Sequence, residues 1–331
     1  MIRCIDISIW LLVMGFLFSF IGSISGLSIA TYLSVFCFIF SLYIYNRMTP
    51  ILGLSIVLLS IILLSYSPSP YYLAALTPLV GFFFSGSRKY LSTNSASMRL
   101  ALFFSVCLIY SIFFFIGFES FSGSHNQLSA FVALALIVEI LYFGKPTRLY
   151  ILLILISFFI IGNRSSIFLM AAFVKNKLIL ILFLITSLMF ILISSEMSIS
   201  PDFLLFLFND GGLLNRGYVE TRWFYWDEFI EGFNFFNLNY NTWQFSDVPQ
   251  TSSGFYDLHN SFLTIIVRDS YLGILKVFFW FTTILYLPFG VFSAVTLRAF
   301  HDTFLLGGII DIFVYALIGS CIKKFFGYNK N

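Results

Sequence analysis

The chain has 331 residues, of which 60% are hydrophobic, 21% are aromatic and only 10% are charged. A soluble globular domain is typically about 25% charged, so this composition excludes an ordinary water-soluble fold and indicates that the bilayer is the solvent of most of the chain. The formal net charge of +3 is small, and no basic stripe with interleaved aromatic residues occurs, so nucleic-acid binding is not expected.

The four cysteines lie in or beside apolar runs: Cys4, Cys37, Cys107 and Cys321. They show neither a CxxC pattern nor a Cys/His spacing. We therefore expect no zinc or other metal site and no disulfide framework.

Nine apolar runs occupy residues 1–195, and we interpret them as the N-terminal transmembrane helices. A spanning helix needs roughly 20 residues, so the shorter runs indicate tilt, local thinning or half-spans. The first run is interpreted as an uncleaved span, because no clear cleavage site followed by a soluble domain appears. The runs are Ile5–Ile24, Gly26–Tyr45, Ile51–Tyr66, Tyr71–Ser85, Leu100–Phe118, Leu128–Phe143, Leu149–Gly162, Ser165–Val174 and Leu178–Ser195.

Residues 196–258 form the only long polar segment. It contains nine of the fifteen acidic residues, three of the five tryptophans, and both Arg216 and Arg222. Apolar runs flank it on both sides, so it is predicted to be one large loop at one membrane face. Any chemistry is expected where this loop meets the membrane.

Residues 259–331 are predicted to hold a short surface helix, Ser261–Asp269, and further transmembrane helices. Tyr271–Thr296 is one generous span or two very short ones folded at Pro288, and Phe304–Cys321 is the last run. Length favours one span and eleven in total, whereas charge favours two spans and twelve in total. We favour twelve, because this arrangement puts the lysines that follow the last run inside.

The distribution of Lys and Arg sets the orientation. With the N-terminus inside, the small outer turns carry almost no positive charge, which places residues 196–258 in the periplasm. Arg164, in Asn163-Arg164-Ser165-Ser166, is the exception among these turns, and a functional role would explain it. The inner side carries Arg3, Arg47, Arg88, Lys89, Arg99, Lys145, Arg148, Lys175 and Lys177.

Three residues are candidates for chemistry at the outer face: Arg164, Arg222 and His259. The planar guanidinium matches phosphate oxygens, and histidine ordinarily titrates near neutrality. The alternative is that His259 is simply interfacial and that Arg222 only solubilises an aromatic belt at Trp223 and Trp226.

Four segments resemble motifs of one family. They are Asn163-Arg164-Ser165-Ser166, Thr221-Arg222 with Trp226, His259-Asn260-Ser261-Phe262-Leu263 with Gly273 downstream, and Arg298-Ala299-Phe300-His301-Asp302-Thr303. Together with the layout of many spans and one large loop, they resemble the bacterial O-antigen polymerase and O-antigen ligase superfamily, most closely the Wzy-type polymerases.

The match has two departures from the family pattern. Ser270 stands where the first glycine of Gly-x-x-Gly is usual, and Gly273 keeps only the second. Gly232 lies one position earlier than the glycine expected after the loop arginine, so Arg216 is an alternative to Arg222.

The resemblance implies an all-α, polytopic glycosyltransferase of the bacterial inner membrane that uses neither a metal nor another cofactor. Its donor would be an oligosaccharide on undecaprenyl diphosphate, and its acceptor the sugar end of another lipid-linked repeat unit. Besides membrane lipids, a chain-length regulator and a flippase are candidate partners.

The resemblance also implies roles for individual residues. Arg164 and Arg222 would bind the diphosphate. His259 would be the base or a donor to phosphate, with Glu220 or Asp257 as the alternative base. The residues expected to bind substrate are Arg216, Glu220, Trp223, Trp226, Asp257, Asn260 and Arg298.

Other functions stay open on the sequence. An O-antigen ligase would use the same donor but would join the polysaccharide to lipid A core. A flippase or transporter of lipid-linked sugars would need paired charges near mid-membrane, for which Glu139, Lys276 and Asp311 are the candidates. A non-catalytic envelope scaffold is the third alternative.

Overall fold

The fold is described from a computed structural model of the chain. Helix accounts for most of the described residues and no strand occurs among them, which confirms the expected all-α class for this part of the chain. The described residues are 4–25, 28–46, 80–82, 84–85, 96–116, 125–159, 163–182, 185, 228–235, 258, 260–301 and 310–325.

The helices coincide with the apolar runs to within a few residues at most ends. A helix pairs its interior backbone N–H and C=O groups within one segment, so an apolar chain folded this way leaves few polar groups unsatisfied. In chain order the elements are α1 (Cys4–Ser25), α2 (Ser28–Asn46), α5 (Ala96–Ile116), α6 (His125–Phe143), α7 (Leu149–Phe159), the 3-10 helix η1 (Arg164–Phe173), α11 (Ser261–Asp269), α12 (Tyr271–Thr282), the 3-10 helix η4 (Thr283–Leu285), α13 (Phe289–His301) and α14 (Ile310–Phe325).

Several sequence predictions fall outside the described residues. These are the expected span Ile51–Tyr66, most of Tyr71–Ser85 and of Leu178–Ser195, and the polar segment at 196–227 and 236–257. The chain divides into two compact units: residues 1–154, 285–287 and 306–331, and residues 155–284 and 288–305. We call them unit 1 and unit 2 and describe each by itself.

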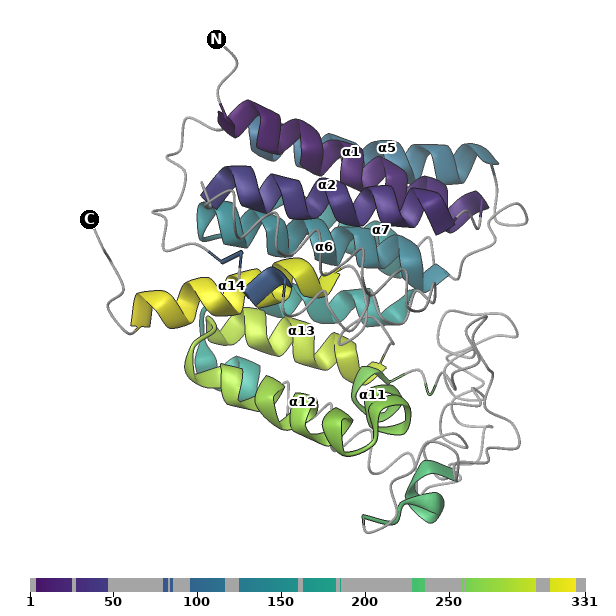
Figure 1. Ribbon diagram of the computed structural model, residues 1–331, viewed down its shortest axis with the longest axis vertical. Helices are drawn as coiled ribbons and strands as arrows, with labels where there is room; N and C mark the ends of the chain where they lie inside the picture. The colour runs from purple at the N-terminus through teal and green to yellow at the C-terminus, as the bar shows by residue number, and fades with distance from the viewer. Residues whose placement is uncertain are drawn as a thin grey trace. The chain divides into compact units, whose positions relative to one another are not determined.

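In unit 1, α1 and α2 lie side by side (Figure 1). Hydroxyl groups join them: Ser8 Oγ donates to the Ser41 carbonyl at 3.0 Å, and Ser41 Oγ donates to the Ser8 carbonyl at 2.9 Å. The Ser41 hydroxyl also lies 3.1 Å from the Tyr142 hydroxyl of α6. Phe38 extends the packing to α14, with its ring centroid 5.2 Å from that of Phe313. The helices of unit 1 are therefore held by small hydroxyls as well as by aromatic packing.

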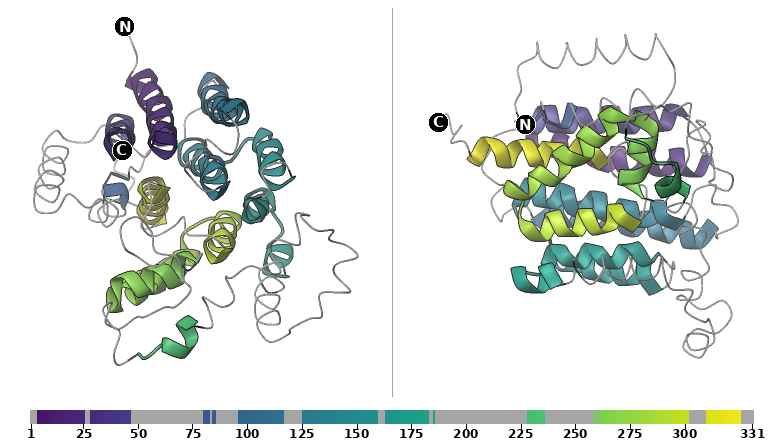
Figure 2. Two further views of the ribbon diagram at one scale, coloured as in Figure 1. Left: turned by 90° about the vertical axis from the view of Figure 1, so that its right-hand side faces the viewer. Right: turned by 90° about the horizontal axis from the view of Figure 1, so that it is seen from below.

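In unit 2, α11, α12 and α13 lie together (Figures 1 and 2). Trp280 of α12 is fully buried, donates from its indole nitrogen to Thr296 Oγ1 of α13 at 3.0 Å, and stacks on Phe292. The stretch expected as one span or two is thus two helices, because η4 ends at Leu285 and α13 starts at Phe289. The Pro288 carbonyl accepts from the backbone N–H groups of Val291 and Phe292 and so starts α13.

Two expectations about individual elements have definite outcomes. The short helix predicted at Ser261–Asp269 is confirmed with the same bounds as α11, and five of its nine residues are buried. The short apolar run Ser165–Val174 is helical, but as the 3-10 helix η1, whose smaller number of residues per turn gives it a different set of faces from an α-helix.

Judged by length and apolar composition alone, one helix segment among the described residues, Ile29–Asn46, could cross a membrane. Shorter apolar helices occur at Ile7–Gly22, Arg99–Phe113, Ser129–Phe143, Leu149–Phe159 and Tyr271–Leu285.

Candidate functional site

In unit 2, helices that begin at two of the sequence motifs pack against α13, which ends in the third. The 3-10 helix η1, which starts at Arg164, packs along α13. The ring of Phe168 lies 4.4 Å from the ring of His301 at the end of α13. From the other direction, Phe262 in the first turn of α11 lies 4.9 Å from Phe300. The middle of η1 and the first turn of α11 therefore both contact the last turn of α13, although the three are far apart in the sequence.

Asn163 caps the start of η1. Its side-chain oxygen accepts from the backbone N–H of Ser166 at 3.0 Å and from the Ser165 hydroxyl at 2.8 Å. Ser166 Oγ donates back to the Asn163 carbonyl at 2.6 Å. Such a cap satisfies the first N–H groups of a helix. Three residues of Asn163-Arg164-Ser165-Ser166 thus build the turn that presents the fourth, Arg164, whose side chain lies outside the described part.

Asn260 caps α11 in the same way. Its side-chain oxygen accepts from the backbone N–H groups of Phe262 and Leu263 at 3.0 and 3.1 Å. One residue earlier than His259, the Leu258 N–H donates to Thr264 Oγ1 at 3.2 Å. His259 itself is outside the described residues, but the chain is anchored on both sides of it. The structure gives Asn260, expected to bind substrate, a defined structural role as a cap.

Arg298 lies in the last turn of α13 and is fully buried. Burying a guanidinium is costly unless it is paired, so a buried arginine marks a site where its charge has a use. His301, one turn further on, places its Nδ1 2.9 Å from the Leu297 carbonyl. Arg298, expected to bind substrate, thus lies at the end of α13 that contacts Phe168 of η1 and Phe262 of α11.

Within unit 2, the described part of the polar segment contacts the start of α12. A short helix at residues 228–232 is followed by Phe235, whose carbonyl accepts from the Tyr271 hydroxyl at 2.9 Å. The rings of these two residues also make an edge contact. The other candidates of this segment lie outside the described residues: Arg216, Glu220, Arg222, Trp223, Trp226 and Asp257.

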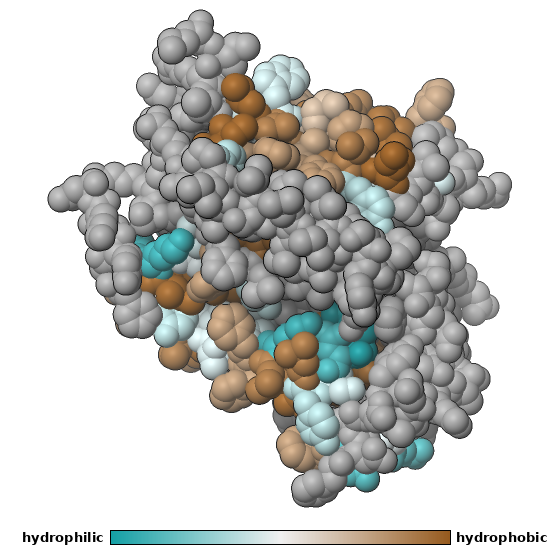
Figure 3. Space-filling model, viewed as in Figure 1, coloured by the Kyte–Doolittle hydropathy of each residue, from teal (hydrophilic) through white to brown (hydrophobic). Residues whose placement is uncertain are grey.

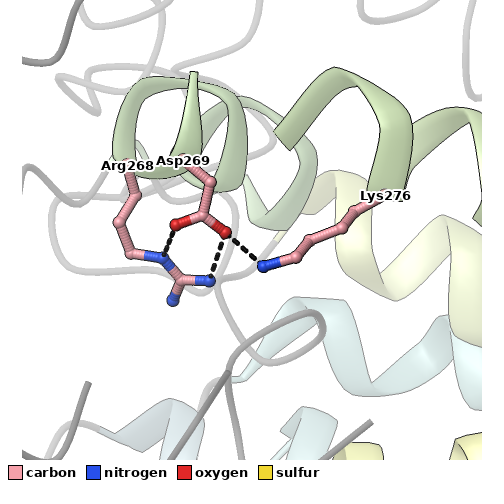
Figure 4. Close-up of polar contacts among 3 residues, drawn as sticks. All are labelled: Arg268, Asp269 and Lys276. Carbon is pink, nitrogen blue, oxygen red and sulfur yellow. Dashed lines mark hydrogen bonds and ion pairs between the residues drawn. The ribbon is translucent and has the colours of Figure 1, made fainter. Parts of the chain in front are cut away.

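A charged cluster at the junction of α11 and α12 was not predicted as part of the site. Asp269 accepts from Arg268 Nε at 2.9 Å, from Arg268 Nη2 at 3.2 Å and from Lys276 Nζ at 2.5 Å (Figure 4). The sequence signal was the Arg-Asp pair at the end of a short amphipathic helix, followed seven residues later by a lysine. A bend between two helices is needed to bring that lysine to the aspartate.

The charged residues proposed for a transporter are held in local contacts. Glu139 of α6, fully buried, accepts from the Thr147 backbone N–H at 2.6 Å and from the Thr147 hydroxyl, and its carboxylate lies 3.7 Å from Arg99 Nε. Lys276 is paired with Asp269. Asp311 is buried in the first turn of α14. The contacts of Glu139 tie the end of α6 to the loop that follows it.

Within the part of the chain that the structure describes, no group of three or more His, Cys, Asp or Glu side chains could hold a metal ion. Comparison with protein-family models, with curated proteins and with solved structures gave no match.

Proposed function

We propose that this protein is a polytopic glycosyltransferase of the bacterial inner membrane, of the O-antigen polymerase type. It transfers an oligosaccharide from undecaprenyl diphosphate to the sugar end of another lipid-linked repeat unit at the periplasmic face. The observation that carries the proposal is a set of contacts within unit 2. The last turn of α13, where Arg298 lies, contacts Phe168 of η1, which Asn163 caps, and Phe262 of α11, which Asn260 caps.

The distribution of apolar side chains supports a membrane location. Large exposed hydrophobic residues follow one another at helical spacing on α5, at Leu100, Phe104 and Leu108, and Phe115 of the same helix is 92% exposed. Apolar surface also gathers where α1 and α5 lie (Figure 3). In contrast, the hydroxyls of Ser8 and Ser41 are buried between helices. Apolar residues outside and small polar residues between helices are expected of proteins whose solvent is lipid.

The chemistry needs fixed positive charge. The diphosphate leaves carrying negative charge, and cations preorganised in a water-poor site stabilise that charge as it develops. Arg164 begins η1 and buried Arg298 lies in the last turn of α13, and we assign these two arginines to the diphosphate. Arg222 or Arg216 of the polar segment would supply the third.

Two of the helices that contact the end of α13, η1 and α11, start at a motif segment. The first N–H groups of a helix carry a partial positive charge that favours anions. Here the side-chain oxygens of Asn163 and Asn260 use some of those groups. We therefore assign the main stabilisation to the guanidinium groups and only a minor part to the helix dipoles.

An acceptor hydroxyl must also lose a proton. His259 directly precedes the capped start of α11 and is our choice for the base, with Glu220 and Asp257 as alternatives. A second role for His259, donation of a hydrogen bond to phosphate, is compatible with the same position. The pH dependence of the rate separates the two roles.

A ligase would use this donor site equally well, because the two activities differ only in the acceptor. The segment Arg298–Thr303 resembles polymerases and is the reason for our preference. A transporter is less well supported, because Glu139 is held by the loop that follows α6 and Lys276 is paired with Asp269 at the junction of α11 and α12.

The direct test uses purified protein in liposomes with the lipid-linked repeat unit as the only substrate. A polymerase lengthens the chains, a transporter moves the lipid across the bilayer without lengthening them, and a scaffold does neither. The expected result is longer lipid-linked chains in the absence of nucleotide sugar. A preparation that transports the lipid but leaves it at one repeat unit would contradict the proposal.

Deletion of the gene distinguishes polymerase from ligase on a lipopolysaccharide gel. Without a polymerase, the core still receives one repeat unit, so a single band above bare core is expected. Without a ligase, the core receives nothing and long chains accumulate on undecaprenyl diphosphate. Bare core together with accumulated long chains would establish the ligase instead.

A further inference from the structure

The chain turns from α11 into α12 at a single residue, Ser270. This residue has φ 55° and ψ −128°, a conformation that side-chain-bearing residues rarely adopt. Its backbone is bonded on both sides: its N–H donates to the Ile266 carbonyl at 2.8 Å, and its carbonyl accepts from the Ile274 N–H at 3.2 Å. An unfavourable backbone conformation persists only where surrounding contacts hold it.

The Asp269 carboxylate provides one set of those contacts. The Asp269 side chain is only 3% exposed, and the side chains of its partners Arg268 and Lys276 are 12% and 22% exposed. Arg268 reaches both carboxylate oxygens, and Lys276 reaches one of them from the second turn of α12 (Figure 4). Because the carboxylate is buried, water cannot readily replace these partners. The contact with Lys276 therefore joins the end of α11 to α12.

Gly273 provides the second contact. A Cβ atom at this position would collide with the carbonyl oxygen of Ile265 in α11. The two helices thus approach so closely that α12 has no room for a side chain there. The bend is held by the close packing of Gly273 against Ile265 and by the ion pair of Lys276 with Asp269.

The angle of this bend determines where the start of α11 lies. The helix has nine residues and is therefore about 14 Å long. Over this length, a rotation of α11 by about 5° about Ser270 moves the start of the helix by about 1 Å. His259 directly precedes the Asn260 cap at this start. A displacement of about 1 Å of a reacting group can lower a rate on the order of 100-fold.

We propose that Asp269, with its carboxylate held by Arg268, is a positioning residue that fixes the angle between α11 and α12 through Lys276. It thereby fixes the start of α11, which Asn260 caps and which His259 precedes in the sequence. The catalytic consequence depends on the proposed function, whereas the geometric part does not. Asp269 touches neither donor nor acceptor in this proposal and acts through α11.

The test combines a distance with a rate, measured on the full chain in liposomes. Spin labels are placed at Leu263 of α11 and at the exposed Phe278 of α12, after replacement of the four native cysteines by alanine. The variants are Asp269→Asn, which removes the charge at nearly constant volume, and Asp269→Glu, which keeps it. Glu231→Gln is the matched control, because Glu231 is an exposed carboxylate in the same unit.

We expect one narrow distance distribution for the parent protein and for Glu231→Gln. Asp269→Asn should broaden or shift it, and Asp269→Glu should restore part of the narrow distribution. In the polymerisation assay, Asp269→Asn should lower kcat on the order of 100-fold with little change in KM. A merely structural role would lower the yield of inserted protein and leave kcat per inserted molecule unchanged.

An unchanged distance distribution in Asp269→Asn would overturn the proposal, whatever the activity. A changed distribution with unchanged kcat would overturn the link to His259. If Asp269→Asn does not insert, Lys276→Gln replaces it, and a comparable broadening is expected, because Lys276 supplies the contact that crosses from α12 to α11. If the parent protein makes no polymer, the proposed function fails, and the distance alone then decides whether Asp269 fixes the bend.

Discussion

Ser270 occupies a backbone conformation that glycine adopts more easily. In the superfamily that the sequence resembles, the first glycine of Gly-x-x-Gly stands at this position. The positive φ of Ser270 is a physical reason for a glycine there. The second glycine, Gly273, is required for a different reason, which is the close approach of the Ile265 carbonyl.

We expect Ser270→Gly to stabilise the protein by about 1 kcal/mol, because relief of the strain exceeds the extra entropy of glycine in the unfolded chain. The thermal midpoint in detergent should rise by about 2 °C. The matched control is Ser293→Gly within α13, where the hydroxyl donates to the Phe289 carbonyl at 2.8 Å and glycine is unfavourable. A fall in midpoint for Ser270→Gly would show that the serine side chain makes a stabilising contact at the bend.

Arg164 and Arg222 are expected to act on the diphosphate. Arg164→Ala and Arg222→Ala should each reduce polymer formation on the order of 100- to 1,000-fold while the protein still inserts, because one stabilising donor is lost. Lysine should rescue only in part, since it lacks the planar fork. Arg148→Ala is the control, because Arg148 is exposed and belongs to the expected inner side. Near-normal polymer in Arg222→Ala would transfer the role to Arg216.

His259→Ala is expected to be inactive, with normal insertion. If His259 is the base, the rate of the parent protein should fall as the pH drops through the pKa of this imidazole, because the protonated ring cannot accept a proton. If it only donates to phosphate, protonation keeps the donor and the rate should not fall in this way. Normal polymer in His259→Ala would remove the residue from the site.

At the scale of elements, apolar run length and polar interruptions were sufficient to predict α1, α2, α5, α6 and α11. The bounds of α11 could be predicted because Asn260 is a strong cap and Ser270 breaks the pattern. The length of the run Tyr271–Thr296 did not show whether it divides into two helices. Pro288 was the residue that indicated the division. The 3-10 form of η1 had no signal in the apolar pattern.

The candidate site was only partly predictable. The motif arginines and His259 could be selected from residue chemistry and the family resemblance. The contact of Asp269 with Lys276 could not, because it depends on the bend at Ser270. Likewise, the sequence does not reveal that η1 packs against the end of α13, since that contact joins residues over a hundred positions apart.

The division of α12 from α13 makes a prediction about topology. If both cross the membrane, residues after α13 return to the side of the large polar segment, and the end of α14 lies on the opposite side. Alkaline phosphatase fused at Thr303 should therefore be active, and a fusion at Asn331 should be inactive. At 12 and 13 residues, the two helices are about 18 and 20 Å long, so the bilayer must be locally thin or the ends buried.

Two fusions serve as controls for this experiment. A fusion at Thr242 should be active in any model that places the polar segment in the periplasm, and a fusion at Lys89 should be inactive. The eleven-span arrangement reverses the results at Thr303 and Asn331 only. Reversal at Thr242 and Lys89 as well would overturn the whole orientation.

At the scale of the whole molecule, the described part has a buried apolar core, but it also exposes large apolar side chains and buries several polar ones. Trp10 of α1 is 68% exposed, whereas Ser8 of the same helix is fully buried. Arg298 is fully buried, whereas Phe115 of α5 is 92% exposed. Water disfavours the exposure of Trp10 and Phe115, whereas lipid favours it and also allows the small Ser8 hydroxyl between helices. A buried charge such as that of Arg298 is tolerated in lipid where it serves a site, as we propose here.

The difference in exposure between Trp10 and Trp280 predicts which tryptophan contacts lipid. In single-tryptophan variants with the other four replaced by phenylalanine, Trp10 should be strongly quenched by phospholipids brominated in their acyl chains. Trp280 is fully buried and donates to Thr296, so it should be quenched far less. Bromine quenches by contact, and the difference between the two variants therefore reports exposure to hydrocarbon rather than mere association with liposomes. Equally weak quenching of both would mean that the exposed face of α1 is covered by protein or water, and the assignment of α1 as a lipid-facing helix would have to be abandoned.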